Sequence, residues 1–418
     1  MREFLLQTSL RLYSFASVRL LFSIGRWFVV LISLNSLDTN SFATLLLIIS
    51  VIEIIKLSTD FGLEPFIFLR IDTSRTRDRV WDFICRVKVT VAFISFLLVF
   101  FVGVYIENLG LAICGVLLIT GNLITVLQGI IQKNNLLQGL HFLSLKAGST
   151  LFLLAMIVLH LDNWESFIYT LVLFEVAVVI VIAHHIGFSL IRYHLFGVAL
   201  KNNHRVKIFK ILLNRSGLIY LTTLIANLAA RTDVILIRPM IGVFAQAQYS
   251  AAYKLTEPLL QIVASVILSV LVSRSNFSKL DNSQTLGKIM KSRWYNVMCI
   301  GAVGIAFTAI TLSVNFFTGA LSAQSNILFL LFITLAPIRI LNQLHSYALM
   351  KFNLMRIVFL STLSLALMFG ITFLILLTGK ISPTTIYLIF ALFSVGEILN
   401  FFCQWFYLRK ILGISNNF

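Results

Sequence analysis

Long apolar segments run through almost the whole chain of 418 residues, and they constrain its fold more than any other feature. A helix that crosses a bilayer needs about 20 predominantly apolar residues. Transmembrane strands would instead show shorter segments of about ten residues in which apolar and polar positions alternate, so the long segments predict helices. Twelve windows qualify, at about 12–34, 41–62, 84–106, 109–131, 140–160, 165–189, 212–238, 246–272, 294–317, 325–349, 353–378 and 384–408.

Composition excludes a soluble protein. Hydrophobic residues make up 59% of the chain and charged residues 12%, and the mean hydropathy is +0.96, whereas a soluble domain carries about 25% charged residues. The net charge of +17 would suit a nucleic-acid-binding protein. However, the basic residues lie mostly in short loops between apolar segments, and no soluble basic domain is present, so we expect no nucleic-acid partner.

Lys and Arg gather in alternate loops, which predicts how the chain crosses the bilayer. The basic stretches are 70–88, 192–210, 274–293 and 409–410, and the loops between them are nearly free of Lys and Arg. Basic loops stay on the cytoplasmic side. Both termini are therefore expected in the cytoplasm, which requires an even number of helices.

The basic stretch 196–211 is interpreted as a cytoplasmic linker between an N-terminal lobe, 1–195, and a C-terminal lobe, 212–418. Each lobe would hold six helices. Because six is even, a repeat of the two lobes must be parallel, with its axis along the membrane normal. The expected fold is an all-α polytopic membrane protein with twelve transmembrane helices in two parallel-repeat six-helix lobes around a central cavity.

Several expected membrane helices carry polar residues at steps of three and four, which places them on one helical face. The most polar stretch is 229–261, expected as two helices joined by a turn at about 238–248. Such residues mark functional sites, or they pair with one another as structural contacts between helices. Both interpretations stay open for pairs such as Lys56 with Glu53 and Lys254 with Glu257. Two further polar faces, at Arg339, Asn342 and Gln343 and at Glu397, Asn400 and Gln404, lie in windows 325–349 and 384–408.

No catalytic motif is present: the sequence contains no P-loop, no HExxH and no GxSxG. The four cysteines lie far apart within apolar segments, which suggests neither a disulfide framework nor a zinc site. We therefore expect no enzyme activity, no cofactor and no metal. A membrane-embedded polysaccharide polymerase or ligase would usually need a large outer loop, and the outer loops here are short.

Two stretches carry a resemblance to a known family. One runs from Asp233 through Gly242 to YSAAYKLTEPL, with Tyr249, Ala251, Ala252 and Lys254, and the other is DFGLEPFIFLR at 60–70. Together with the topology, they resemble the Wzx-type polysaccharide (O-antigen) flippases of the MATE/lipid-flippase (MOP) superfamily.

The resemblance implies a MATE-like fold and a specific task. Such flippases move an undecaprenyl-pyrophosphate-linked oligosaccharide from the cytoplasmic to the periplasmic leaflet of the bacterial inner membrane by alternating access, for lipopolysaccharide and similar polysaccharides. The coupling ion would be H⁺ or Na⁺, and other polysaccharide-assembly membrane proteins would be partners. The alternatives are a MATE-type drug or cation antiporter and, less favoured, a membrane-embedded polymerase or ligase.

On this interpretation the polar residues divide into two groups. The substrate-binding candidates, cations for the diphosphate and polar or aromatic groups for the sugars, are Arg26, Lys56, Asn227, Arg231, Tyr249, Tyr253, Lys254 and Gln261. The ion-coupling candidates are the carboxylates Glu53, Asp60, Asp233 and Glu257.

Overall fold

The computed structural model describes most of the expected helices. The described residues are 33, 36–60, 74–133, 164–187, 191–192, 195, 217–257, 323–351, 354–378 and 385–411. Regular structure within these ranges is entirely helical, which confirms the all-α class. Six helices of this part of the chain are long and apolar enough to cross a membrane. The chain is therefore a multi-pass membrane protein.

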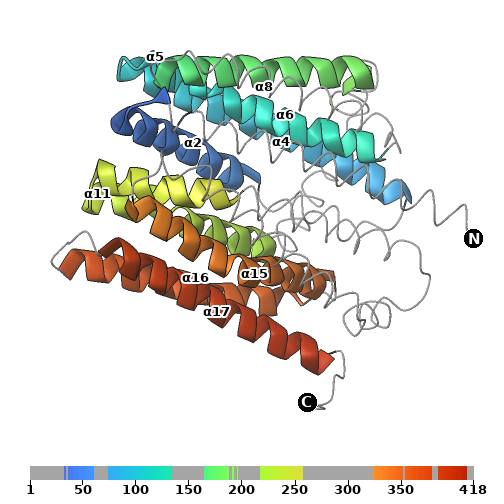
Figure 1. The fold of residues 1–418 in the computed structure, drawn as a ribbon. Coiled ribbons are helices and arrows are strands. Elements are labelled where there is room, and N and C mark those ends of the chain that lie inside the picture. Colours follow the sequence, from blue (N-terminus) through green and yellow to red (C-terminus); the bar gives the residue numbers. More distant parts are fainter. Residues whose placement is uncertain are drawn as a thin grey trace, which may run out of the picture. The chain divides into compact units, whose positions relative to one another are not determined.

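The described residues fall into two compact units, one over 36–228 and the other over 229–411 together with residue 33. The first contains α2 (Thr39–Asp60), α4 (Ser74–Tyr105), α5 (Leu109–Cys114), α6 (Val116–Lys133) and α8 (Trp164–Ile186), followed by helix Gly217–Ala230, which continues past the division. Within this unit α6 packs along α8, α4 packs against α5 and α6, and α2 contacts α4, α6 and α8 (Figure 1).

The connection between α4 and α5 shows how local chemistry closes a tight turn in this unit. Glu107 has a positive φ of 56°, and Asn108 caps α5 by accepting a hydrogen bond from the Leu111 backbone N–H at 2.8 Å. The turn brings α5 so close to α4 that a Cβ on Gly103 would lie 2.6 Å from the Ala112 Cα. Only glycine fits at this crossing.

A similar cap precedes α2. The Asp38 carboxylate accepts hydrogen bonds from the backbone N–H groups of Asn40 at 3.0 Å and Ser41 at 3.3 Å. A hydrogen bond with the Ser41 side chain, and then these backbone bonds, lower the pKa of Asp38 from its ordinary value. The carboxylate therefore caps α2 in its charged form, and that contribution is lost as the pH falls through the lowered pKa.

The second unit contains the rest of the described helices. After the end of helix Gly217–Ala230 come a π-helix at Asp233–Ile237, α11 (Arg238–Met240) and a helix over 243–257. Three long helices follow, α15 (Ala323–Lys351), α16 (Met355–Thr378) and α17 (Thr385–Ile411). Helix α17 packs along both α15 and α16 (Figure 1).

Some expected boundaries are wrong. The expected turn at 238–248 is confined to Ile241 and Gly242, and the next helix already begins at residue 243. Gly242 has a φ of 121°, a conformation that glycine adopts readily, and its N–H bonds the Ile237 carbonyl at 3.1 Å. The window 84–106 matches the apolar span Asp82–Tyr105 of α4, and the helix continues N-terminally to Ser74 through basic turns that a hydropathy window excludes. The window 109–131 is interrupted at Gly115, between α5 and α6.

The contact at Gly103 yields a stability prediction. Gly103→Ala should destabilise the protein by about 1–3 kcal/mol, because the new methyl group overlaps the backbone of α5. Gly370→Ala in α16 is the matched control, since a Cβ there meets nothing within 4 Å. It should stabilise its helix by about 0.5–1 kcal/mol. Thermal unfolding of both purified variants, followed by circular dichroism, measures the difference. Equal melting temperatures would contradict the described packing of α4 on α5.

Candidate functional site

The helix over 243–257 places an aromatic and polar face against α15. Tyr249, Tyr253 and Glu257 follow at steps of four, so they share one side of the helix. Both tyrosines are buried. Their rings meet the ring of Phe332 on α15 edge to face, with centroids 5.1 Å and 5.4 Å apart. Phe332 in turn meets Phe390 of α17 at 5.0 Å. This aromatic packing fixes how the three helices lie against one another.

Two basic side chains share the carboxylate of Glu257. The Lys254 Nζ lies 3.1 Å from Glu257 Oε2, and the Arg231 Nη2 lies 3.8 Å from Glu257 Oε1. The side chains of Arg231 and Lys254 are only 6% and 8% exposed, and that of Glu257 is 21% exposed. The structural pairing that the sequence left open for Lys254 and Glu257 is therefore present, and Arg231 joins it.

A third ion pair joins α15 to α17. Arg339 Nε lies 3.3 Å from Glu397 Oε1, and Arg339 Nη2 donates a hydrogen bond to the Tyr253 hydroxyl at 3.1 Å. Asn342 Nδ2 donates to Glu397 Oε2 at 2.7 Å and to the Glu397 backbone carbonyl at 2.9 Å. The guanidinium of Arg339 also lies over the rings of Tyr253 and Phe393, at 5.2 Å and 5.5 Å from their centroids.

The two groups of charges belong to one region, because Tyr253 and Glu257 lie one turn apart and Glu257 acts electrostatically on Arg339. We refer to Arg231, Lys254, Glu257, Arg339 and Glu397 as the basic cluster. In its three ion pairs, three basic side chains share two carboxylates. Among the residues whose side chains the structure describes, the bases of this cluster outnumber its acids, which is the chemistry that an anion site needs.

Sequence reasoning assigned no role to Arg339, Asn342 or Glu397, although it noted their polar faces. The available signal was the step of three between Arg339 and Asn342, together with a single carboxylate in the apolar segment 385–404. Which distant helix each face contacts could not be derived from spacing. The structure supplies this information by bringing both faces onto one carboxylate.

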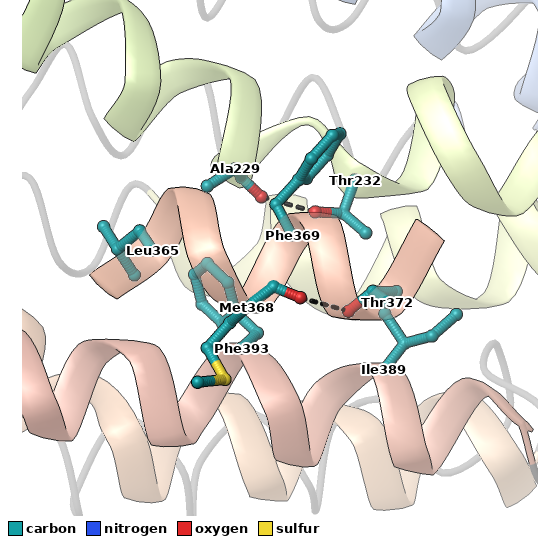
Figure 2. A pocket seen from close by; sticks show the side chains of 8 residues that line it. All are labelled: Ala229, Thr232, Leu365, Met368, Phe369, Thr372, Ile389 and Phe393. Atoms are coloured by element: carbon teal, nitrogen blue, oxygen red, sulfur yellow. Dashed lines mark hydrogen bonds between the residues drawn. The ribbon is translucent and has the colours of Figure 1, made fainter. Parts of the chain in front are cut away.

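A small pocket adjoins the cluster in the second unit (Figure 2). It is lined by Ala229, Thr232, Leu365, Met368, Phe369, Thr372, Ile389 and Phe393. The hydroxyls of Thr232 and Thr372 donate to carbonyls of their own helical segments, at 2.6 Å and 2.8 Å, so the wall is essentially apolar. Phe393 belongs both to this pocket and to the aromatic contacts of Arg339.

In the first unit, polar groups from three helices come together. Glu53 and Lys56 are half-buried on α2, and the Lys56 ammonium lies against α6, since a Cβ on Gly121 would be 2.7 Å from its Nζ. The neighbouring Thr120 donates a short hydrogen bond to Glu175 of α8. Sequence reasoning missed Glu175, although it is a carboxylate in the apolar interior of α8, beyond the Glu165 of the first turn, and could have been found on that ground.

The remaining sequence candidates are placed as follows. Asn227 donates to the Thr223 carbonyl of its own helix at 2.7 Å. Tyr249 is fully buried and its ring is used in packing. Asp60 ends α2 and Asp233 begins the π-helix, but the positions of their side chains lie outside what the structure describes, as do Arg26 and Gln261 altogether. Among the described residues, no group of three or more His, Cys, Asp or Glu could hold a metal ion.

Comparisons with known proteins address the fold. No protein-family model and no curated protein sequence matches the chain. Solved structures of MATE transporters match it over nearly its full length.

The eukaryotic MATE transporter AtDTX14 is 11% identical, with 98% of this chain and 96% of that chain covered and a TM-score of 0.60. A mutant of the Vibrio cholerae MATE transporter VcmN is 13% identical, with 98% of each chain covered and a TM-score of 0.62. The chain has the MATE fold. An inward-facing multidrug resistance MATE family transporter of the MOP superfamily matches at 15% identity, 96% and 95% coverage and a TM-score of 0.57. The expected MATE-like fold is thus confirmed, whereas the flippase function remains a prediction.

The sharing of one carboxylate by two bases yields a second prediction. Glu257→Ala should destabilise the protein by about 3 kcal/mol or more, because Arg231 and Lys254 stay buried without their common counter-ion. Glu165→Ala, in the first turn of α8, is the control and should change stability by no more than about 1 kcal/mol. Thermal unfolding of the purified variants measures both effects. A Glu257→Ala protein as stable as the control would mean that the ion pairs contribute nothing.

Proposed function

We propose that the protein is a lipid-linked oligosaccharide flippase, of the Wzx type within the MOP superfamily. It moves an undecaprenyl-pyrophosphate-linked repeat unit from the cytoplasmic to the periplasmic leaflet of a bacterial inner membrane. Twelve helices in two lobes surround a central cavity, and alternating access exposes that cavity to each side. The protein acts as a transporter and catalyses no covalent step.

The observation that carries this proposal is the composition of the basic cluster. Three bases share two carboxylates in a MATE fold, and a diphosphate ester is the kind of ligand that buried arginines and lysines recognise. Arg contacts phosphoryl oxygens in bidentate fashion, whereas Lys acts as a point charge. The lipid tail stays in the bilayer while the head group crosses through the cavity.

The runner-up is a drug or cation antiporter. It is favoured by the fold, because one matching structure is a multidrug resistance MATE family transporter. A site for cations would need carboxylates available to neutralise the ligand. Glu257 and Glu397 are instead held by Arg and Lys at 3.1–3.8 Å. The cluster therefore supports an anionic substrate better than a cationic one.

Ion coupling is part of the proposal. One charge moving through 100 mV is worth about 2.3 kcal/mol, so a single H⁺ or Na⁺ can bias the transport cycle. The candidate carriers are Glu53, Asp60, Asp233 and Glu257, and the structure adds Glu175, which takes a hydrogen bond from Thr120 within the membrane-spanning part of the first unit.

Reconstitution distinguishes the two functions. The purified protein is placed in proteoliposomes with a fluorescent oligosaccharide linked through pyrophosphate to a polyprenol, and in parallel with a fluorescent organic cation. We expect the lipid-linked oligosaccharide to reach the opposite leaflet, and the cation to accumulate no faster than in protein-free liposomes. Transport of the cation alone would overturn the flippase proposal and support the antiporter.

The basic cluster also predicts the effect of losing single cations. Arg231→Ala and Lys254→Ala should each reduce polysaccharide export about tenfold, because one charge-assisted contact to the phosphate is lost. Each variant keeps one of the two described ion pairs of Glu257, so the protein should remain folded in the membrane. Arg356→Ala and Lys410→Ala remove exposed bases and are the matched controls. Export is measured as surface polysaccharide in a deletion strain, with the membrane level of each variant measured by immunoblotting. Normal export in both cluster variants would contradict the cationic site.

A further inference from the structure

The Arg339–Glu397 pair points to a more specific mechanism for the proposed substrate. We propose that the phosphate of the substrate and the Glu397 carboxylate compete for the Arg339 guanidinium, so that binding of the anion is accompanied by protonation of Glu397. This inference rests on the proposed function. It goes beyond it by naming the residue that receives the phosphate and the residue that it displaces.

Among the described residues, Arg339 and Asn342 of α15 hold the Glu397 side chain and backbone. Its Oε1 faces Arg339 Nε at 3.3 Å, and its Oε2 accepts from Asn342 Nδ2 at 2.7 Å. Because Asn342 Nδ2 also donates to the Glu397 carbonyl, two acceptors fix the orientation of this amide. Asn342 would therefore keep Glu397 in place after protonation, when the carboxyl group no longer attracts a cation.

Arg339 is held independently of Glu397. Its side chain is 13% exposed, its Nη2 donates to the Tyr253 hydroxyl, and its guanidinium lies over the rings of Tyr253 and Phe393. Within the described residues, Arg339 Nη1 is buried and has no hydrogen-bond partner. A buried guanidinium therefore retains one unused donor edge, which matches a phosphoryl oxygen.

The same contacts imply that Arg339 pairs either with the ionised Glu397 carboxylate or with the phosphate, but not with both. Arginine keeps its proton at every physiological pH, so a buried guanidinium needs a counter-ion. An ionised Glu397 supplies it and would repel a phosphate placed beside it. Once Glu397 is protonated, the phosphate becomes the stable partner of Arg339. The phosphate and one proton are therefore expected to bind together.

Other charged groups around the pair set the local field. From the segment at Arg231 and from the helix over 243–257 come Arg231, Tyr253, Lys254 and Glu257, of which Tyr253 contacts Arg339 and Glu257 acts on it electrostatically. Helix α15 also carries His345, which stacks on Phe401. Helix α16 carries Arg356 as its only described ionisable residue, and that residue is exposed. Helix α17 ends in Arg409 and Lys410. Within the basic cluster, Glu397 contacts α15 through both carboxylate oxygens, by an ion pair from Oε1 to Arg339 and a hydrogen bond from Asn342 to Oε2.

Joint binding has an electrical consequence. The diphosphate diester of the lipid carries two negative charges, and one proton on Glu397 offsets one of them. The loaded site therefore gains one net negative charge. A membrane potential that is negative inside then favours outward movement of the loaded site.

The test measures binding of farnesyl diphosphate, a short prenyl diphosphate, to the full-length protein in detergent between pH 5.5 and 8.5. The affinity of the parent protein should fall as the pH rises, by up to about tenfold per pH unit for one coupled proton, in addition to any effect from the ligand's own protonation. Glu397→Gln cannot ionise but keeps a partner for Asn342. It should bind at pH 8 about as tightly as the parent at low pH, and only the ligand's own titration should remain.

A double variant separates this role from a structural one. Arg339→Met with Glu397→Met replaces a buried ion pair by apolar groups, an exchange that is often neutral for stability. We expect it to lose farnesyl diphosphate binding at least tenfold, whereas a merely structural pair would leave affinity and its pH dependence unchanged. If this variant does not fold, the pH profiles of Glu397→Gln and the parent protein still test the role of Glu397.

Three outcomes would overturn the inference. A parent-like pH profile in Glu397→Gln removes the role of Glu397, and parent-like affinity in the folded double variant removes the role of Arg339. Either result, with diphosphate still bound, would leave the flippase proposal standing. Absence of farnesyl diphosphate binding in the parent, together with binding of an organic cation, would overturn the inference and the proposed function alike.

Discussion

Charged side chains on apolar helices need partners, and this constraint organises the second unit. A charge within the membrane is tolerated where it faces protein or water and is paired. Glu257 meets Arg231 and Lys254, while Glu397 meets Arg339 and Asn342. Each carboxylate therefore ties together segments that are far apart in the sequence. Among the described ion pairs the bases outnumber the acids, and the proposed site for an anion rests on that imbalance.

Aromatic packing gives these charges a fixed geometry. Phe332 lies against Tyr249, Tyr253 and Phe390, so one ring on α15 contacts both the helix over 243–257 and α17. Tyr253 takes part twice, because its ring packs on Phe332 and its hydroxyl accepts from Arg339. The adjoining pocket is nearly apolar, with its two threonine hydroxyls directed at their own backbone. The pocket therefore offers no charged group to a ligand, and the proposed recognition of an anion is assigned to the cluster.

The sequence predicted what depends on local patterns and failed where distant contacts decide. Apolar length located the helices, and the step of three between Lys254 and Glu257 made their pairing one of two open interpretations, of which the structure shows the pair. The membrane span expected at 84–106 agrees with the apolar part of α4, Asp82–Tyr105, while its basic first turns from Ser74 lie outside what a hydropathy window detects. The contact of Arg231 with Glu257 and that of Arg339 with Glu397 depend on which helices face each other. A single sequence does not show how distant helices face each other. Glu175 was missed for a different reason. Its neighbours at steps of three and four on α8 are apolar, so it belongs to no polar helical face, although its carboxylate accepts a hydrogen bond from Thr120.

We propose, above all, that the basic cluster receives the phosphate of an anionic lipid-linked substrate. A structure of the full-length protein determined with a prenyl diphosphate bound tests this claim most directly. We predict the diphosphate within hydrogen-bonding distance of Arg339, with the distance between Arg339 Nε and Glu397 Oε1 increased beyond its present 3.3 Å. A diphosphate bound elsewhere, with all three ion pairs of the cluster unchanged, would contradict the account.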